Sequence, residues 1–181
     1  MKYYAQINSK NILVGMSMSK LVRDEYDSEN VQNIEVSTEI FNNYMQYGDN
    51  YYIWDGNAVI KNPSYEQEQA ELRKQDFLKD FFKVEGFGYY RRQPKGYQSA
   101  VESMNVLFNI ANVSQGIQAG LIIFYQEPDF SKPEECTEEW LLEHQIIMPA
   151  MTLQEFMQLY VAFMTAWNTE EHVSEVENDT I

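Results

Sequence analysis

The sequence predicts an α+β fold, in which a β-hairpin-rich N-terminal module precedes a mixed helix/strand domain that ends in an amphipathic helix. Short β-rich runs separated by turn residues fill residues 1–63. After Asn62-Pro63, apolar residues recur at helical spacing. Of the 181 residues, 44% are hydrophobic and 14% are aromatic, which is enough for a buried core. The predicted parts are the module 1–63, a domain over 64–170 and an acidic, flexible tail over 171–181.

Two hairpins are predicted in the N-terminal module. The runs 2–7 and 11–16 are rich in β-forming residues, and the Asn-Ser-Lys sequence at 8–10 between them suits a tight turn. Residues 51–60 contain Asp55-Gly56, which is a strong signal for a two-residue hairpin turn. Both segments are therefore expected to form antiparallel strand pairs.

A strand and a helix are predicted between these hairpins. Residues 31–36 alternate apolar and polar side chains, as a half-buried strand does. Ser37 or Thr38 is placed to cap a helix that runs through Tyr47, and Gly48 is placed to end it. The module is therefore expected to combine strands with one short helix.

The domain over 64–170 is predicted to open with a helix. Ser64 and Gln67 have the spacing of a capping box, and the charged run that follows to Lys83 carries helically spaced aromatic residues. The further elements expected are a strand or extended loop over 87–92, a helix over 98–113, a strand over 120–125, an acidic helix over 137–143 and a strand over 145–148.

The last predicted helix begins at a second capping box. Thr152 and Glu155 form this box, and the helix runs to about Asn168 with its aromatic side chains on one face. That face is expected to pack mainly in the core. The alternative is an exposed face that binds a partner or a second copy of the chain.

The charge of the chain is unevenly distributed. The formal net charge is −15, yet residues 1–23 contain no acid and carry Lys2, Lys10, Lys20 and Arg23. From Glu127 to the end, acidic residues are opposed by one base, Lys132. A chain polarised in this way can present a basic tip and an acidic body to a partner of mixed charge.

Catalytic and metal-binding motifs are not recognised in this sequence. His144 and His172 are isolated, and acidic neighbours raise the pKa of the single thiol, Cys136. We therefore expect no metal and no cofactor, and enzymatic activity is left open without a catalytic motif to assign. The sequence shows neither a membrane-spanning run nor a secretory signal, which predicts a protein of the reducing cytoplasm.

Two basic, tyrosine-bearing patches are candidate binding sites, because Arg and Lys pair with phosphates and tyrosine rings stack on unpaired bases. Segment 89–97 has an alternative reading, in which its cations pair with the protein's own acids and its tyrosines pack. The N-terminal hairpin has one too, in which its charges protect a sheet edge. The candidate partner-binding or RNA-binding residues are Lys2, Tyr3, Tyr4, Asn8, Lys10 and Lys20 on the hairpin, and Arg91, Arg92, Lys95 and Tyr97 on the segment.

Short motifs along the chain carry a family resemblance. They are Lys2-Tyr3-Tyr4-Ala5-Gln6-Ile7-Asn8, Asn11-Ile12-Leu13-Val14-Gly15, Ile53-Trp54-Asp55-Gly56, Asn62-Pro63-Ser64, the predicted helix over 98–113, the strand around Leu121–Tyr125, and Thr152-Leu153. With these motifs the chain resembles small phage and prophage tail-fibre-associated proteins. The resemblance implies a phage origin and a role beside the tail fibre. In size and charge the chain also resembles anti-CRISPR proteins.

The leading hypothesis is a phage-encoded inhibitor of a host RNA-guided nuclease, acting in the host cytoplasm. Such a nuclease lines its channels with Lys and Arg and holds RNA against them. The acidic body would bind this host nucleic-acid-binding protein, and the basic hairpin would contact its guide RNA. The first alternative is a tail-fibre-associated or fibre-assembly protein, whose partner is a virion tail protein. The second is an RNA-directed hydrolase that is active only with its target. No membrane partner is expected.

Overall fold

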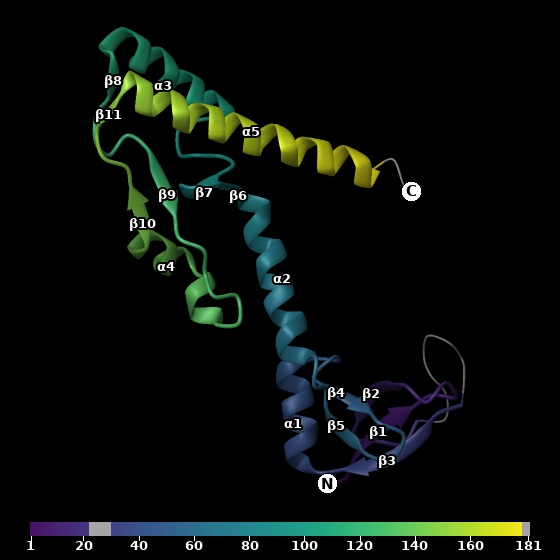
Figure 1. Cartoon of the computed structure of the whole chain (residues 1–181). Helices are drawn as coiled ribbons and strands as arrows, with labels where there is room; N and C mark the ends of the chain where they lie inside the picture. The colour runs from purple at the N-terminus through teal and green to yellow at the C-terminus, as the bar shows by residue number, and fades with distance from the viewer. Residues whose placement is uncertain (22–29, 179–181) are drawn as a thin grey trace. The chain divides into compact units, whose positions relative to one another are not determined.

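The computed structural model describes residues 1–21 and 30–178, with side chains up to residue 169 (Figure 1). Within these residues 42% of the chain is helical and 25% is in strands, which confirms the predicted α+β class. The chain forms two compact units, Met1–Glu68 and Gln69–Ile181. Arg23, which was counted in the basic N-terminal segment, lies outside the described residues.

Unit 1 contains a three-stranded antiparallel sheet with the order β2-β1-β3, a separate hairpin and one helix. The helix begins where the sequence predicts, because Ser37 Oγ accepts a hydrogen bond from Ile40 N at 3.1 Å. Its elements are β1 (Tyr3–Ile7), β2 (Leu13–Ser17), β3 (Gln32–Val36), α1 (Thr38–Tyr47), β4 (Tyr52–Trp54) and β5 (Val59–Lys61).

The central strand β1 has two different faces, as the alternation of a strand requires. Ala5 and Ile7 are buried, and Tyr3 on the same face stacks on Phe41 of α1 with ring centroids 4.2 Å apart. On the opposite face the amide of Gln6 is buried and donates to Ser17 Oγ at 3.0 Å. The buried face of β1 therefore includes Ala5 and Ile7, and Tyr3 at its end packs against α1.

The second hairpin has a longer loop than the predicted two-residue turn. Trp54 pairs with Val59, so residues 55–58 form the loop. Asp55 Oδ1 accepts hydrogen bonds from the N–H groups of Asn57 and Ala58, at 2.8 and 2.7 Å, and Gly56 adopts a φ of 98°. The Asp-Gly signal located the turn correctly, but the aspartate side chain spans more residues than a two-residue turn contains.

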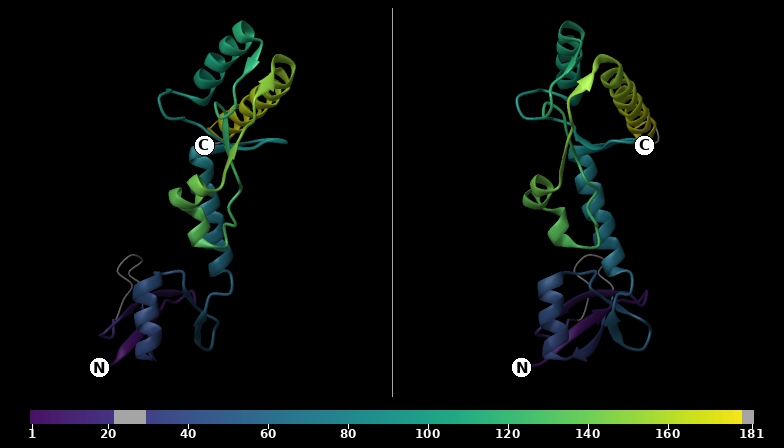
Figure 2. Two further views of the ribbon diagram at one scale, coloured as in Figure 1. Left: turned by 90° about the vertical axis from the view of Figure 1, so that its left-hand side faces the viewer. Right: turned by 60° about the vertical axis from the view of Figure 1, so that its left-hand side comes forward.

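Unit 2 contains a four-stranded antiparallel sheet with the order β10-β9-β7-β6 and a short ladder between β8 and β11. The ladder joins the end of one helix to the start of another (Figure 2). The elements are α2 (Tyr65–Asp80, which begins in unit 1), β6 (Phe81–Val84), β7 (Gly88–Arg91), α3 (Ala100–Ser114), β8 (Gly116–Ile117), β9 (Ile123–Tyr125), the 3-10 helix η1 (Pro133–Cys136), α4 (Glu138–Glu143), β10 (Gln145–Ile147), β11 (Met151–Thr152) and α5 (Leu153–Asn178).

Alternate residues of β6 enter two separate clusters on the two faces of the sheet. Phe82 joins the main core, which α3 and α5 cover as they lie side by side (Figures 1 and 2). Phe163 of α5 is fully buried there, with its ring centroid 5.2 Å from that of Phe82. Phe81 points the other way and stacks on Phe77 of α2 at 4.5 Å. The aromatic face of the last helix is therefore core, as predicted.

Three details of α2 and α5 differ from the sequence prediction. The first helix ends at Asp80 instead of Lys83, because the following residues form β6. The predicted capping box at Ser64 does not form; instead Asn62 Oδ1 accepts a hydrogen bond from Ser64 N at 3.0 Å. The last helix extends past Asn168 to Asn178. The end of the predicted flexible tail, residues 179–181, lies outside the described residues, and so do the side chains from 170 on.

The second capping box forms as predicted. Thr152 N donates to Glu155 Oε2 at 2.8 Å, and Glu155 N donates to Thr152 Oγ1 at 3.3 Å. These bonds satisfy N–H groups at the start of α5 that have no partner within the helix. A search of the described helices finds none with both the length and the hydropathy needed to cross a membrane.

Candidate functional site

The basic residues of the N-terminal hairpin lie on an exposed part of unit 1. Lys2 Nζ forms an ion pair with Glu35 Oε2 of β3 at 2.7 Å. The hydrogen bond to Glu35 raises the pKa of Lys2. Lys20 Nζ lies over the ring of Tyr4, 5.4 Å from its centroid. Lys2, Tyr4 and Lys20 therefore form one basic surface, whose cations already contact an acid or a ring.

Three other predicted contact residues of this hairpin are placed differently. Tyr3 faces α1, as described above, and is not on the surface of Lys2 and Tyr4. Asn8 is buried, and its Oδ1 accepts hydrogen bonds from Lys10 N at 3.0 Å and from Ile12 N at 2.9 Å. The Lys10 side chain is exposed at the tip of the turn. Asn8 therefore shapes the turn between β1 and β2.

The two tyrosines that open segment 89–97 are buried on opposite faces of β7. The hydroxyl of Tyr89 donates to Glu127 Oε1 at 3.0 Å. The hydroxyl of Tyr90 lies 3.0 Å from Ser103 Oγ, and burial raises the pKa of Tyr90. Because β7 is an inner strand of its sheet, these rings are not available for stacking on a base.

The two arginines of the segment also have contacts inside unit 2. Arg91 donates to Glu138 Oε1 at 2.7 Å, and its guanidinium lies 4.8 Å from the centroid of Phe81. Arg92 Nε donates to the carbonyl of Leu78 at 3.0 Å. These contacts match the alternative reading of the segment, in which its cations pair within the protein.

The end of the segment is a loop before α3. Tyr97 N donates to the carbonyl of Pro94 at 3.1 Å, and Gly96 has a φ of 89°, which glycine adopts readily. Lys95 is exposed, and Tyr97 is half-buried. Lys95 is therefore the cation of segment 89–97 that lies farthest out on the surface.

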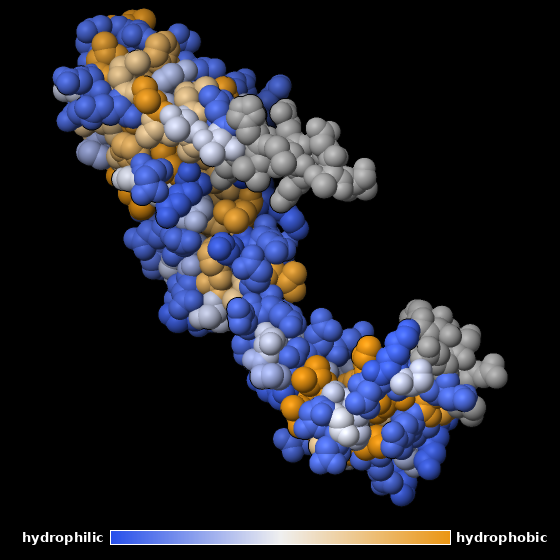
Figure 3. Space-filling model, turned by 45° about the vertical axis from the view of Figure 1, so that its right-hand side comes forward, coloured by the Kyte–Doolittle hydropathy of each residue, from blue (hydrophilic) through white to orange (hydrophobic). Residues whose placement is uncertain are grey.

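A surface that was not singled out from the sequence lies on α3. Val106, Ile110 and Val113 occur at helical spacing and are 39%, 40% and 86% exposed. The one charged residue of this helix, the exposed Glu102, lies one turn before Val106 on the same side of the helix, where it accepts a hydrogen bond from Gln98 N at 2.6 Å. We call Val106, Ile110 and Val113 the α3 face; it is apolar and uncharged within a chain of net charge −15. Figure 3 shows apolar residues at the surface between hydrophilic ones.

The sequence did contain a signal for the α3 face. The sequence of the predicted helix 98–113 places Val101, Met104, Leu107, Phe108 and Ala111 at helical spacing; Met104, Leu107 and Ala111 are buried, and Val101 and Phe108 are half-buried against the main core. The remaining apolar positions of the same helix must then point outward, since the inward stripe does not include them. The exposed stripe was not predicted, because helical spacing was assigned only to the residues that face the core.

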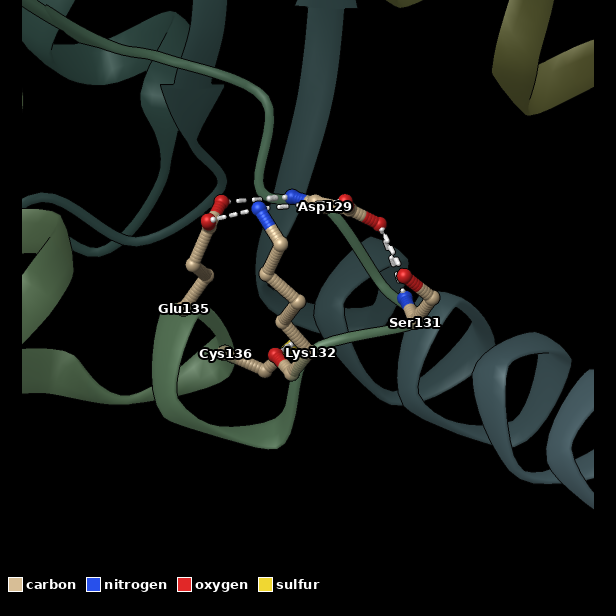
Figure 4. A network of polar contacts seen from close by, with 5 residues as sticks. All are labelled: Asp129, Ser131, Lys132, Glu135 and Cys136. Carbon is tan, nitrogen blue, oxygen red and sulfur yellow. Dashed lines mark hydrogen bonds and ion pairs between the residues drawn. The ribbon is translucent and has the colours of Figure 1, made fainter.

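The single thiol and the loop around it form a local network (Figure 4). Asp129 Oδ1 accepts from Ser131 Oγ at 2.6 Å, and Lys132 Nζ lies 2.9 Å from Glu135 Oε1 and 3.4 Å from Asp129 Oδ2. Cys136 Sγ donates to the Lys132 carbonyl at 3.5 Å. Burial raises the pKa of the Cys136 thiol, which keeps it protonated near neutral pH. This network orders the loop between β9 and α4.

The histidine that the structure describes is held by its neighbours. The ring of His144 stacks on Trp140 with centroids 3.9 Å apart, and Nδ1 lies 2.8 Å from the Trp140 carbonyl. Among the side chains that the structure describes, in residues 1–21 and 30–169, no three His, Cys, Asp or Glu residues are grouped as metal ligands. Comparison with protein-family models, curated proteins and solved structures finds no match.

Proposed function

We propose that this chain is a phage or prophage protein that acts by binding another protein, and that its partner is a tail-fibre protein of the virion. In this role it accompanies the fibre or assists its assembly in the host cytoplasm. The proposal rests on the α3 face for the kind of partner, and on the family resemblance for the identity of the partner.

The α3 face is the observation that carries the proposal. Three aliphatic side chains in line on one helix expose apolar surface to water, and interface centres are depleted in charged residues. The chain as a whole is strongly acidic, so the uncharged face of α3 is a surface that can lose its water at low cost. Such a surface fits an apolar patch on a protein better than it fits a phosphate backbone.

The contacts of segment 89–97 favour a protein over RNA as the partner. Tyr89 and Tyr90 are buried, and Arg91 and Arg92 have contacts inside unit 2. Binding of single-stranded RNA uses exposed rings and cations that can reach phosphates. Tyr89, Tyr90, Arg91 and Arg92 are therefore used for folding, while Lys95 and the half-buried Tyr97 of this segment remain at the surface.

The resemblance supports the fibre as the partner. Among the motifs that carry the resemblance to tail-fibre-associated proteins, Trp54-Asp55-Gly56 lies in the hairpin of β4 and β5, Asn62-Pro63 lies before α2, and Thr152-Leu153 lies at the start of α5. Two compact units on one chain also give two separate surfaces for a long partner.

Co-expression with the tail-fibre protein of the same phage or prophage tests this proposal. We expect the tagged chain to co-purify with the fibre protein, and ribonuclease treatment to leave the yield unchanged. Val113→Glu should abolish co-purification, while Val161→Glu, a matched change at another exposed valine of unit 2, should not. A fibre protein that is not retained by the wild-type chain would refute the proposed partner.

An inhibitor of a host RNA-guided nuclease is the second candidate function. It is favoured by Lys2 and Lys20, which lie exposed beside Tyr4, and by the net charge of −15, which suits a basic protein surface. Recovery of such a nuclease from host lysate, with a yield that falls after ribonuclease treatment, would favour this candidate over the fibre partner.

A further inference from the structure

A cavity of about 390 Å³ lies in unit 1 between the two hairpins. The residues that line it include the aromatic residues Tyr52 and Trp54, the acids Asp49 and Glu68, and Asn11. This volume lies at the low end of the range for ligand pockets, which suits one side chain and its flanking backbone better than a large ligand.

The aromatic wall of this cavity is held in place by neighbouring amides. Trp54 Nε1 donates to Asn11 Oδ1 at 2.8 Å, and Asn11 sits in the turn that Asn8 organises, with a φ of 65°. The hydroxyl of Tyr52, whose side chain is buried, accepts a hydrogen bond from Asn43 Nδ2 at 3.2 Å. The two rings are therefore fixed before any ligand binds, which lowers the entropic cost of binding.

The carboxylates of the cavity have no cationic partner among the described residues. Asp49 Oδ1 accepts a hydrogen bond from the neutral hydroxyl of Tyr44 at 2.6 Å, which leaves the charge of Asp49 uncompensated. Glu68 forms no side-chain hydrogen bond or ion pair within the described part of the chain. None of the described residues that line the cavity is basic.

The same protein shows how its own fold holds a guanidinium. In unit 2, Arg91 lies over Phe81 and Tyr125, at 4.8 and 5.4 Å from the ring centroids, and pairs with Glu138. A nearby cavity of about 320 Å³ in that unit is lined by Arg73 as well as by acids. The cavity of unit 1 combines aromatic rings with carboxylates in the same way but contributes no cation of its own.

We propose that the cavity of unit 1 binds an arginine side chain of the partner protein. Its planar guanidinium can stack on the indole of Trp54 and donate charge-assisted hydrogen bonds to the carboxylates of Glu68 and Asp49, which a neutral side chain cannot do. That a partner protein supplies this arginine rests on the proposed function. Binding of an arginine side chain to the cavity can be measured without any partner.

Titration of the full chain with Nα-acetyl-arginine methylamide tests this inference by NMR. The probe should shift the indole Nε1–H resonance of Trp54, assigned with Trp54→Phe, in a saturable way at millimolar concentration. The neutral isostere Nα-acetyl-citrulline methylamide should bind at least about threefold more weakly, the factor expected when an exposed ion pair is lost. Equal binding of the two probes, or no saturable shift with arginine, would overturn the proposal.

Two charge-matched variants show whether the cavity is responsible. Glu68→Gln should weaken arginine binding by about threefold to fivefold. Glu39→Gln removes the same charge from α1, outside the cavity, and should leave arginine binding unchanged. If both variants weakened arginine binding equally, the effect would come from the overall charge of the chain, and the proposed site would be rejected. Failure of co-purification with the fibre protein would leave this titration unaffected, so the two proposals can fail separately.

Discussion

Arg91 of β7 and Glu138 of α4 form an ion pair at 2.7 Å, while the guanidinium of Arg91 covers the ring of Phe81, its direct cross-strand neighbour. The pair links the sheet of unit 2 to α4, and the side chain of Arg91 is only 26% exposed. Arg91, which the sequence suggested as a cation for ligand binding, therefore stabilises the fold of unit 2.

Arg91→Met should destabilise unit 2 by about 1–2 kcal/mol, because it removes both the ion pair and the cation–π contact. Arg91→Lys should lose roughly half of that, since it retains the charge but not the planar stacking. Urea unfolding followed by circular dichroism measures both values. An Arg91→Met variant as stable as wild type would show that the arginine is free to bind a ligand instead.

Asn8→Ala should destabilise unit 1 by about 1–2 kcal/mol, because two backbone N–H groups lose their acceptor. Hydrogen exchange at the amides of Lys10 and Ile12 should accelerate in the variant. Asn8→Asp keeps an acceptor oxygen and should protect both amides nearly as well as asparagine does. Unchanged exchange in Asn8→Ala would contradict the assigned role in the turn.

Stability should depend on pH through Asp129, whose pKa is lowered by its hydrogen bonds from Ser131. A carboxyl with a lowered folded-state pKa adds stability that is present above its unfolded pKa, near 3.8, and that is lost as the pH falls through the folded value. The difference in stability between wild type and Asp129→Ala should therefore shrink below about pH 4. Ser131→Ala should show a weaker pH dependence than wild type. A wild-type-to-Asp129→Ala difference that is constant from pH 3 to 7 would exclude this linkage.

Gly88→Ala should be far more damaging than Gly86→Ala. A Cβ at Gly88 would lie 2.9 Å from the carbonyl oxygen of Tyr125, and the residue has a φ of 121°. Gly86 has a φ of 82°, but its Cβ would meet no atom within 4 Å, so its cost is the backbone strain of about 1–2 kcal/mol. The loss of stability, measured by thermal unfolding, should be at least twice as large for Gly88→Ala as for Gly86→Ala. Equal losses would mean that strand β9 moves freely away from β7.

Local signals in the sequence were sufficient to predict most of the helices and strands. Ser37, the Asp55-Gly56 pair and the Thr152–Glu155 box mark ends and turns through short-range hydrogen bonds, and such signals do not depend on the rest of the chain. They located the helices that begin at Thr38 and Leu153 within a residue.

The end of α2 could not be predicted from local pattern. Phe77, Leu78, Phe81 and Phe82 fit a helical spacing, but Phe81 and Phe82 are in a strand and face two different clusters. Pairing with β7 decides the conformation of these residues, and a helical period cannot be distinguished from a strand over so short a run.

The candidate site was harder to predict because charge and composition do not reveal the contacts of a side chain. The sequence suggested that Arg91 and Arg92 bind a partner. Only the folded structure shows which rings and acids these two side chains contact. The α3 face was derivable from the helical period. The cavity of unit 1 was not, since Trp54 and Glu68 come together only after the hairpins and helices have packed.

The affinity of surface variants for the proposed tail-fibre partner tests the central claim most directly. Titration calorimetry should compare wild type, Val113→Glu and Lys20→Gln, at low and at high salt. We predict that Val113→Glu weakens binding by about tenfold or more, as loss of a central apolar contact does. Lys20→Gln should bind like wild type, and added salt should weaken binding by no more than the roughly threefold to fivefold that the arginine contact in unit 1 contributes, because the α3 face is uncharged. Full affinity in Val113→Glu, together with a loss in Lys20→Gln and at high salt, would contradict the account and locate the interface on the basic N-terminal sheet.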